Sequence, residues 1–518
     1  MEAPQPKPSR LKKFIRRLLF TLAALVTFVA LLVAEEEWRS AHAWNSYKRE
    51  MEAKGEHFDA ARLIPPKVPD DQNFGMTPYF ALYFNLPPEI LRQPIVTTTK
   101  LVNGRYVEET TGNVERGTNL RPVWYDREVK RAPRPLGWNC GMAADLTGWA
   151  AAIQGTNADG TAAQITDPAE AATIVLDKMK SCEATLAELQ SASQRPYCRF
   201  NIPYEEIANP QVIAALMQHL AAVKGVYQVL SLHAEAEMVL GRSEQALKDI
   251  EVMFRVDDGL KEEPAIISQL VRYAGAAILL QPVGEGLAEH RWSEAQLGVL
   301  QERLQRTDLI ASTVLGLYGE RDIWSNQMFD RGEVLSGVFP GLFPWGRLEQ
   351  LNINRMFQAT VLPRIDVAAR EINPSVSQAC DARFQVSEGS GLHAFFQHSI
   401  MAKMMLPAFS RVAQKTAFAQ SEVDMAMISC ALERYRLAEG RYPDALNDLV
   451  PRFAARLPHD IINGQPMKYR RTEDGRFVLY SVGWNEKDDG GIVAATKTKP
   501  PRQDVLQGDW VWEYPGKN

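Results

Sequence analysis

Hydrophobic positions are most concentrated near the N-terminus, where Leu18 to Ala34 form an apolar run without a charge. Phe14 and Ile15 extend this run beyond a pair of arginines. A helix rises about 1.5 Å per residue, so about 20 residues cross a hydrocarbon core of roughly 30 Å. We therefore predict a transmembrane helix over residues 14–34, in contact with the lipid bilayer.

The charges on either side of this run predict its orientation. Three glutamates, Glu35 to Glu37, follow it directly. Six basic residues precede it: Lys7, Arg10, Lys12, Lys13, Arg16 and Arg17. By the positive-inside rule, residues 1–13 form a cytoplasmic tail. This predicts a single-pass protein of the cell inner membrane with its bulk in the periplasm.

A cleaved signal peptide is the competing interpretation of the same run. Cleavage after Ala34 would place Leu32 where the processing enzyme prefers a small residue. We therefore favour an uncleaved anchor. Both interpretations place the body of the protein outside the cytoplasm.

Beyond the anchor the apolar spacing is mainly helical. Residues 35–63 continue as a polar juxtamembrane helix, with Gly55 as a stop signal. Asp167-Pro168 and Asn209-Pro210 each place a capping residue before a proline at the first helical position. We expect an irregular helical-hairpin domain over residues 167–412.

Two segments of this domain resemble each other: "RSEQAL" from Arg242 and "WSEAQL" from Trp292. Each is typical of an amphipathic helix with a serine N-cap, Ser243 or Ser293. Residues 64–166 form a mixed region that contains a β-hairpin. Val96 to Val102 and Arg105 to Thr111 are β-prone runs joined by an Asn-Gly turn.

The C-terminal part, residues 413–518, has a different pattern. A helix with one apolar face ends at Gly440 and is followed by a Tyr-Pro turn and a short helical segment. Met467 to Arg471 and Arg476 to Val482 then predict two strands joined by a tight turn. An acidic glycine-rich loop follows the second strand.

This order resembles the C-terminal domain of the major pseudopilin of type II secretion systems. The resemblance covers Met425 to Gly491 and rests on "ALERYRLAEGRYPDALNDLVP", "NGQPMKYR" and "FVLYSVGWNEKDDGG". It implies a small α+β module. The apolar anchor lies far upstream and the pseudopilin processing site is absent from the sequence, so we do not expect assembly into a pilus. The chain as a whole resembles uncharacterised bacterial membrane-anchored proteins with this ending.

The resemblance also implies a calcium site, because the corresponding loop of pseudopilins binds Ca²⁺. Carried over by position, the side-chain ligands are Asn485, Asp488 and Asp489, with backbone oxygens near Tyr480 and Val482. Clustered oxygen ligands in a flexible loop suit Ca²⁺. An ordinary solvated acidic turn is the alternative, and both interpretations stay open.

Composition excludes some classes of function. The net charge is −5 over 518 residues, and no basic stripe lies outside the N-terminus, so we expect no nucleic-acid binding. None of the five cysteines forms a CxxC pair, which argues against a zinc site. Cys182 and Cys198 could close a disulfide in an oxidising compartment or stay separate thiols.

The sequence carries no motif that predicts catalysis. His393 and His398 are five apart and do not share a helix face, Asp145 has the position of a capping or solvated carboxylate, and no serine has a matching base. We therefore expect a mainly α, membrane-anchored protein that acts as a scaffold or interaction protein and has a protein partner. We expect this role to be linked to envelope or secretion machinery. An extracytoplasmic hydrolase, with a site built from distant residues, is the alternative.

Overall fold

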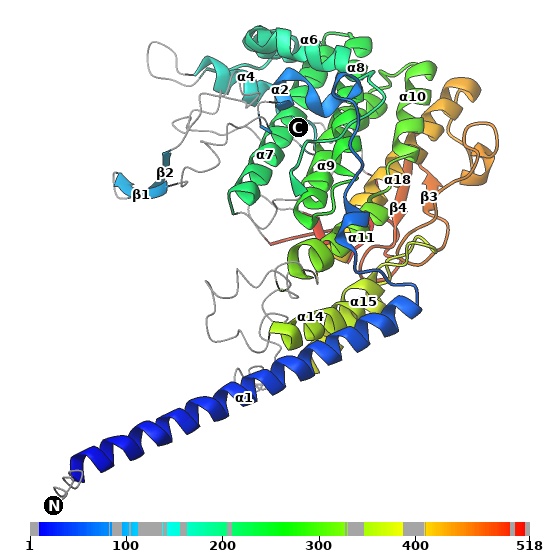
Figure 1. The fold of residues 1–518 in the computed structure, drawn as a ribbon. Coiled ribbons are helices and arrows are strands. Elements are labelled where there is room, and N and C mark those ends of the chain that lie inside the picture. The colour runs from blue at the N-terminus through cyan, green and yellow to red at the C-terminus, as the bar shows by residue number, and fades with distance from the viewer. Residues whose placement is uncertain are drawn as a thin grey trace, which may run out of the picture. The chain divides into compact units, whose positions relative to one another are not determined.

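The computed structural model describes residues 10–81, 83–84, 96–102, 105–111, 137, 142–155, 163–204, 210–326, 329, 346–386, 409, 411–497 and 503–512. The described residues are mainly helical, with a small antiparallel sheet near the C-terminus (Figure 1). The chain divides into two compact units. The first unit comprises residues 1–59, 321–361 and 383–407, and the second comprises 60–320, 362–382 and 408–518.

The first unit is built on helix α1, Arg10–Ala53, which runs without a break through the predicted span and the juxtamembrane segment. Residues 14–34 are almost entirely exposed, and their length and composition would allow the helix to cross a membrane. The helix ends at Ala53, two residues before Gly55, which has a φ of 92° that favours glycine. The predicted apolar helix and its stop signal are confirmed.

The second half of α1 packs against α14, Gly346–Thr360, and the two helices lie side by side in Figure 1. Trp44 and Met51 of α1 are buried. The first unit resumes in the sequence at Arg321. Nη1 of Arg321 lies 2.9 Å from Oε2 of Glu56, and its guanidinium group lies over the Phe58 ring. Aromatic packing and charge pairing therefore fix the end of α1 within this unit.

The second unit contains the helical body. Its long helices pack against each other in sequence, so that α7 contacts α8 and α9, and α9 contacts α11 and α18. The α-helices that begin in this unit are α2 (Pro78–Ala81), α4 (Leu146–Gln154), α5 (Pro168–Met179), α6 (Glu183–Ala192), α7 (Pro210–Val239), α8 (Ser243–Leu260), α9 (Ile266–Ala288), α10 (Glu294–Gln305), α11 (Leu309–Gly319), α15 (Pro374–Val386) and α18 (Val412–Glu439).

Short 3-10 turns and one π-helical turn complete the helical elements. The π-helical turn η6, Glu320–Asn326, crosses the boundary between the two units. The 3-10 turns are η1 (Ala60–Leu63), η2 (Asp70–Gln72), η3 (Phe74–Met76), η4 (Lys180–Cys182), η8 (Leu362–Arg364) and η10 (Leu446–Leu449).

Helix α9 is also apolar and long enough to cross a membrane, but it is mostly buried inside the second unit. Buried leucines and isoleucines on several of its faces contact neighbouring helices. Its Tyr273 hydroxyl bonds to Thr313 of α11 and lies 2.9 Å from the Thr416 hydroxyl of α18. These contacts make α9 the central helix of the body.

Of the predicted helix caps, Asp167 and Ser293 are confirmed and Ser243 is wrong, while Asn209 lies outside the described residues. The Asp167 carboxylate accepts from the N–H groups of Ala169 and Glu170, and Ser293 forms a capping box with Gln296. Ser243, however, is the first residue of α8 and not its N-cap, which is Arg242. The Ser243 hydroxyl instead accepts from Nε2 of Gln296 at 3.2 Å, so the two similar segments begin neighbouring helices.

Strands β1, Val96–Val102, and β2, Arg105–Thr111, form the predicted antiparallel hairpin. Val102 pairs with Arg105 next to the turn, and Val96 pairs with Thr111 at the open end. This register leaves two residues for the turn, as the Asn-Gly pair predicts. The turn residues themselves lie outside the described part of the chain.

Helix α18 joins the helical body to the C-terminal strands. It ends at Gly440, whose φ is 75°. One side of α18 contacts α9, α10 and α11, and another contacts strands β4 and β7. Its residues are therefore buried on nearly all faces from Val412 to Glu433. The single apolar face predicted for this helix describes only part of its burial.

The C-terminal sheet has the strand order β3-β4-β7. Strands β3 (Lys468–Arg471) and β4 (Phe477–Ser481) are the predicted antiparallel pair, and Arg471 pairs with Phe477 beside the turn. Strand β7, Trp510–Trp512, pairs with the other edge of β4 and was not predicted. A separate two-stranded ladder joins β5 (Val493–Ala495) to β6 (Gln503–Gly508).

The two compact units have other bounds than the domains predicted from the sequence. Residues 408–518 belong to the same unit as 60–320 and 362–382. Gln301 of α10 donates to the carbonyl of Phe453 at 2.8 Å, which ties the C-terminal part to the body. Whether residues 413–518 can fold as a module of their own stays a prediction.

Candidate functional site

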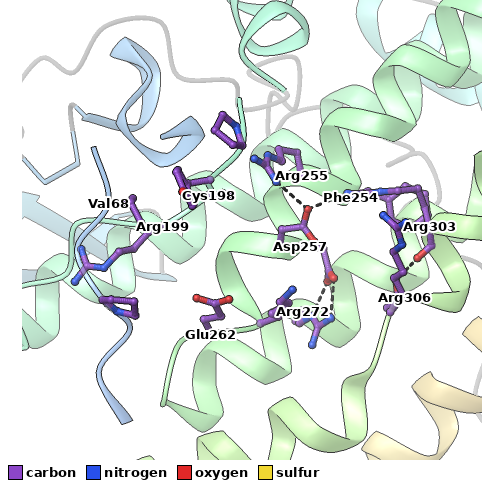
Figure 2. A pocket seen from close by; sticks show the side chains of 16 residues that line it. Val68, Cys198, Arg199, Phe254, Arg255, Asp257, Glu262, Arg272, Arg303 and Arg306 are labelled. Atoms are coloured by element: carbon purple, nitrogen blue, oxygen red, sulfur yellow. Dashed lines mark hydrogen bonds and ion pairs between the residues drawn. The ribbon is translucent and has the colours of Figure 1, made fainter. Parts of the chain in front are cut away.

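A cavity of about 430 Å³ lies in the second unit where α8, α9 and the end of α10 meet an extended stretch of chain (Figure 2). Its walls carry more cationic than anionic side chains. The cations are Arg199, Arg255, Lys261, Arg272, Arg303 and Arg306; the anions are Asp257, Asp258 and Glu262. In Figure 2, Arg199 lies on one side of the cavity and Arg303 and Arg306 on the other.

The base of the cavity is a buried ion pair between neighbouring helices. Nε and Nη2 of Arg272 on α9 lie 2.7 and 2.8 Å from the two carboxylate oxygens of Asp257 on α8. Nη1 of Arg272 donates to the carbonyl of Asp308 at 3.0 Å. Burial alone would lower the pKa of Arg272, but the charge of Asp257 raises it above its ordinary value. The Arg272 side chain is therefore satisfied within the protein and holds the base in place.

Helix spacing presents a second set of charges to the cavity wall. Glu251, Arg255 and Asp258 are separated by four and three positions on α8, so they share one face. Oδ2 of Asp258 accepts from Nη1 of Arg255 at 3.2 Å and from Nη2 of Arg303 at 3.0 Å. Two guanidinium groups thus share one carboxylate oxygen, so Arg255, Arg303 and Asp258 together carry one positive charge.

The Arg255 guanidinium carries a donor without an acceptor. Its Nη2 donates to the carbonyl of Arg195, and its Nη1 donates to Asp258. Its Nε is buried, and no hydrogen-bond partner for it is present in the described part of the chain. An unmet buried donor costs about 1–3 kcal/mol, so an oxygen acceptor at this position would be stabilising.

The remaining wall is the segment Arg195–Arg199, which bends at Arg195 and Pro196 and forms a β-bridge at Tyr197. Tyr197 donates to the carbonyl of Gln72 at 3.2 Å and accepts from the N–H of Phe74 at 2.8 Å. The backbone of Arg199 bonds in both directions to the side-chain amide of Asn73, at 2.8 and 2.7 Å. One edge of the segment is therefore fully paired with residues 72–74.

Cys198 lies in the middle of this segment and contributes to the cavity lining. Burial raises the pKa of its thiol, so the reactive thiolate is disfavoured. A Cβ at Gly259 would overlap its sulfur, which shows that the thiol packs against α8. Cys182 and Cys198 are both free thiols in this structure. We assign Cys198 a packing role and no nucleophilic role.

A second hollow of about 260 Å³ adjoins the first. The two share Pro196, Arg255 and Arg303, and the second adds Arg195 and Glu251 to the lining. Burial raises the pKa of Glu251. The shared residues, among them the paired arginines, lie between the two hollows.

Other titratable clusters lie inside the helical body. His233 bonds through Nδ1 to the buried carboxylate of Asp249 at 2.6 Å, and Gln190 donates to the same carboxylate at 2.7 Å. Burial alone lowers the pKa of His233, but Asp249 raises it overall. The Nε2 of His233 faces Glu237, a carboxylate, at 3.9 Å. A base that faces a carboxylate does not activate a nucleophile in this arrangement.

His219 and Ser268 both bond to Glu263, so the carboxylate separates the imidazole from the hydroxyl. Glu235 is buried beside Glu285, and burial followed by the charge of Glu285 raises the pKa of Glu235 far above its usual range. Glu285 accepts from the N–H of Ala144 at 2.7 Å. These clusters hold helices and loops together, and none of them pairs a nucleophile with a base among the described residues.

The residues of the predicted calcium loop are close together but already bonded to one another and to neighbours. Nδ2 of Asn485 donates to Oδ2 of Asp489 at 2.9 Å. Asp488 accepts from the Tyr480 hydroxyl at 2.9 Å and pairs with Nζ of Lys468 at 3.1 Å. Lys468 holds the pKa of Asp488 below its usual range.

The loop also depends on Asp509, which the sequence did not single out. Its buried carboxylate accepts from the backbone N–H groups of Asp489 at 3.2 Å and Gly491 at 2.6 Å. Across the described residues, no group of three or more His, Cys, Asp or Glu side chains is placed to hold a metal ion. Calcium binding at Asn485, Asp488 and Asp489 stays a prediction.

The other sequence candidates fall into two groups. Asp145 is the N-cap of α4 and accepts from the N–H of Gly148 at 3.0 Å, which confirms its role as a capping carboxylate. His393 and His398 lie outside the described residues. Sequence reasoning named none of the cavity arginines, although the Arg255–Asp258 spacing on a predicted helix is a detectable ion-pair signal.

Comparisons with known proteins do not add an identity to this geometry. Searches of protein-family models, curated proteins and solved structures found no match for the chain. The pseudopilin resemblance of Met425 to Gly491 therefore stays a hypothesis based on its sequence motifs.

Proposed function

We propose that this chain is a single-pass protein of the inner membrane that binds an anionic ligand outside the cytoplasm, as an interaction protein without covalent chemistry. The observation that carries the proposal is the cluster in which Arg255 and Arg303 share one oxygen of Asp258. The apolar part of α1 supports the anchor, and the charges around it support the orientation.

The charges that line the cavity favour an anionic group. Arg272 and Asp257 neutralise each other. Arg255, Arg303 and Asp258 together retain one positive charge, and Arg199 adds another on the opposite wall. A carboxylate group matches the geometry of one guanidinium fork.

The same charges suit recognition better than catalysis. Both arginines are held by Asp258 in a defined position, with side-chain exposures of 13% for Arg255 and 28% for Arg303. A fixed guanidinium loses little conformational entropy when it binds an anion. The pKa of the neighbouring Cys198 thiol is raised, which removes the nearest candidate nucleophile.

A role in envelope or secretion machinery belongs to the same proposal. It is supported by the resemblance of the C-terminal motifs to the major pseudopilin and by the predicted periplasmic placement of the body. In this role the anchored protein would serve as a scaffold for a protein partner. Crosslinking in membranes, followed by identification of the captured partner, tests this part.

The alternative is an extracytoplasmic hydrolase. An observation in its favour is the contact of His233 with Asp249, which orients the imidazole, although no nucleophile is paired with it among the described residues. Turnover of chromogenic esters by the purified chain, lost in His233→Ala and kept in the matched surface variant His290→Ala, would support the alternative. Equal background rates for all three proteins would remove it.

Ligand-dependent unfolding tests the binding proposal directly. We expect acetate, added at constant ionic strength, to raise the unfolding temperature of the full chain in detergent. Stabilisation is about 2.7 kcal/mol at a hundredfold excess over Kd, and each kcal/mol shifts the midpoint by roughly 2–4 °C.

The effect should disappear in Arg303→Gln and persist in Arg441→Gln. Arg441 also pairs with an aspartate, Asp444, but lies on the surface away from the cavity lining. A shift of equal size in both variants would mean that acetate acts on the protein surface in general, and it would contradict the proposed site.

A further inference from the structure

The wall of the cavity formed by residues 197–199 has backbone hydrogen-bonding groups in addition to charged side chains. In an extended chain, the N–H and C=O of one residue point to one edge and those of the next residue point to the other. Tyr197 and Arg199 both bond to residues 72–74. The N–H and C=O of Cys198 are therefore turned to the opposite edge, on the side of the cavity that Cys198 lines.

The backbone groups of Cys198 are available for pairing. Within the described residues, no hydrogen bond joins its N–H or its C=O to another group. An extended residue with an unpaired N–H and C=O can bond to the backbone of an added extended segment. The cavity of about 430 Å³ that Cys198 lines provides space beside this edge.

The paired arginines line the same cavity. Arg255 donates through Nη2 to the carbonyl of Arg195, three residues before Cys198. The chain bends at Arg195 and Pro196, and only the residues after this bend are extended. A segment paired at Cys198 would lie in the cavity that Arg255 and Arg303 also line. A carboxylate there would lie beside the guanidinium group of Arg303, whose Nη2 already bonds to Asp258.

We propose that this cavity binds an extended peptide segment, with its backbone paired to Cys198 and one acidic side chain or terminal carboxylate held between Arg255 and Arg303. This inference rests on the proposed function, because it names the partner of the same cavity. A carboxylate on a peptide satisfies the charge argument and the open backbone edge together, whereas a free small anion satisfies only the first.

A degenerate heptapeptide library displayed on phage tests the inference. It is selected on the full chain in nanodiscs, with the Arg303→Gln protein as the counter-selection. We expect acidic sequences to be enriched. An enriched peptide, made synthetically and labelled, should lose roughly 10- to 100-fold in affinity when its glutamate is replaced by glutamine, as expected for a charge-assisted hydrogen bond.

Two further comparisons separate charge from strand pairing. Arg303→Glu should abolish binding of the acidic peptide and permit binding of the same peptide with lysine in place of glutamate, while Arg441→Gln should leave both unchanged. N-methylation of one peptide N–H group should weaken binding roughly 2- to 10-fold, and methylation of the next residue should have little effect.

The outcomes distinguish this inference from the proposed function. Acidic peptides that bind without sensitivity to N-methylation at any position would overturn the strand pairing. No acidic enrichment, together with stabilisation by acetate that requires Arg303, would overturn the peptide and leave anion binding in place. Failure of both acetate and peptides would overturn the two proposals together.

Discussion

At the scale of single residues, the carboxyl group of Glu422 shows how burial shapes stability. Glu422 lies on α18 with 6% of its surface exposed, and burial raises its pKa from 4.5 to about 8. Between these values the folded state keeps a proton that the unfolded chain has lost. Stability therefore falls as the pH rises through this window, and the loss is complete above about pH 8.

We expect Glu422→Gln to stabilise the protein at high pH only, because glutamine cannot ionise. The gain should be small at pH 5 and roughly 1–3 kcal/mol at pH 8.5. Thermal unfolding of the full chain at the two pH values measures it. Glu302→Gln, on the exposed side of α10, is the control and should show no such trend. An equal effect of Glu422→Gln at both pH values would contradict the assignment.

Two helical glycines give opposite predictions for the same substitution. A Cβ at Gly298 in α10 would meet nothing within 4 Å, so Gly298→Ala should stabilise the protein by about 0.5–1 kcal/mol. A Cβ at Gly319 would overlap the carbonyl oxygen of Pro264, which is backbone and cannot move freely. We expect Gly319→Ala to cost roughly 1–3 kcal/mol. Chemical denaturation compares the two; a loss for Gly298→Ala would show that helix propensity does not decide at that site.

At the scale of elements, α18 is the structural link between the body and the C-terminal strands. Limited proteolysis tests this role. After a cut near Lys415, we expect the two fragments to stay together in size-exclusion chromatography, because α18 is packed between α9–α11 and the strands β4 and β7. A fragment of residues 413–518 that elutes alone and unfolds cooperatively would instead establish the separate module that the sequence predicts.

The loop between β4 and β5 carries the calcium prediction. Millimolar Ca²⁺ should raise the unfolding temperature of the full chain, with about 2.7 kcal/mol of stabilisation at a hundredfold excess over Kd. The double variant Asp488→Ala, Asp489→Ala should lose the effect, and Glu473→Ala in the β3–β4 turn should keep it. Identical unfolding curves with calcium and with chelator would leave the loop as a solvated turn fixed by Lys468 and Asp509.

The sequence predicts elements well where one local rule decides. Asp167-Pro168 begins α5, Gly440 ends α18, and the register of β1 and β2 follows from two turn residues. It predicts poorly where distant segments meet. Strand β7 pairs with β4 across a long connection. Ser243 does not cap its helix, and its hydroxyl accepts a hydrogen bond from Gln296 instead.

The candidate site could not be predicted, because it forms where distant segments meet. Arg199, Arg255, Arg272 and Arg303 come from four separate segments, and only their packing creates a shared carboxylate and an open backbone edge. Any one of them, seen in the sequence, is an ordinary surface arginine on or near a helix. The Asp258 contact with both Arg255 and Arg303 is tertiary information that periodicity does not contain.

At the scale of the whole molecule, membrane topology is the first property to test. A reporter enzyme that is active only outside the cytoplasm should be active when fused after Asn518 and inactive when fused at Met1. The protein should remain in membranes after a high-salt wash, because an apolar helix is held by hydrophobic transfer and not by charge. Release of the body into the soluble fraction would indicate a cleaved signal peptide.

The unbroken course of α1 has a mechanical consequence. Its 44 residues contain no proline or glycine and extend over about 66 Å, of which roughly half exceeds a 30 Å hydrocarbon core. A helix without a kink site behaves as a stiff rod. If the span tilts by about 20°, as transmembrane helices commonly do, its outer end swings sideways by roughly 10 Å. Trp44 and the contact with α14 would move with the helix. A change in bilayer thickness that changes the tilt would therefore shift the residues of the first unit that pack on α1.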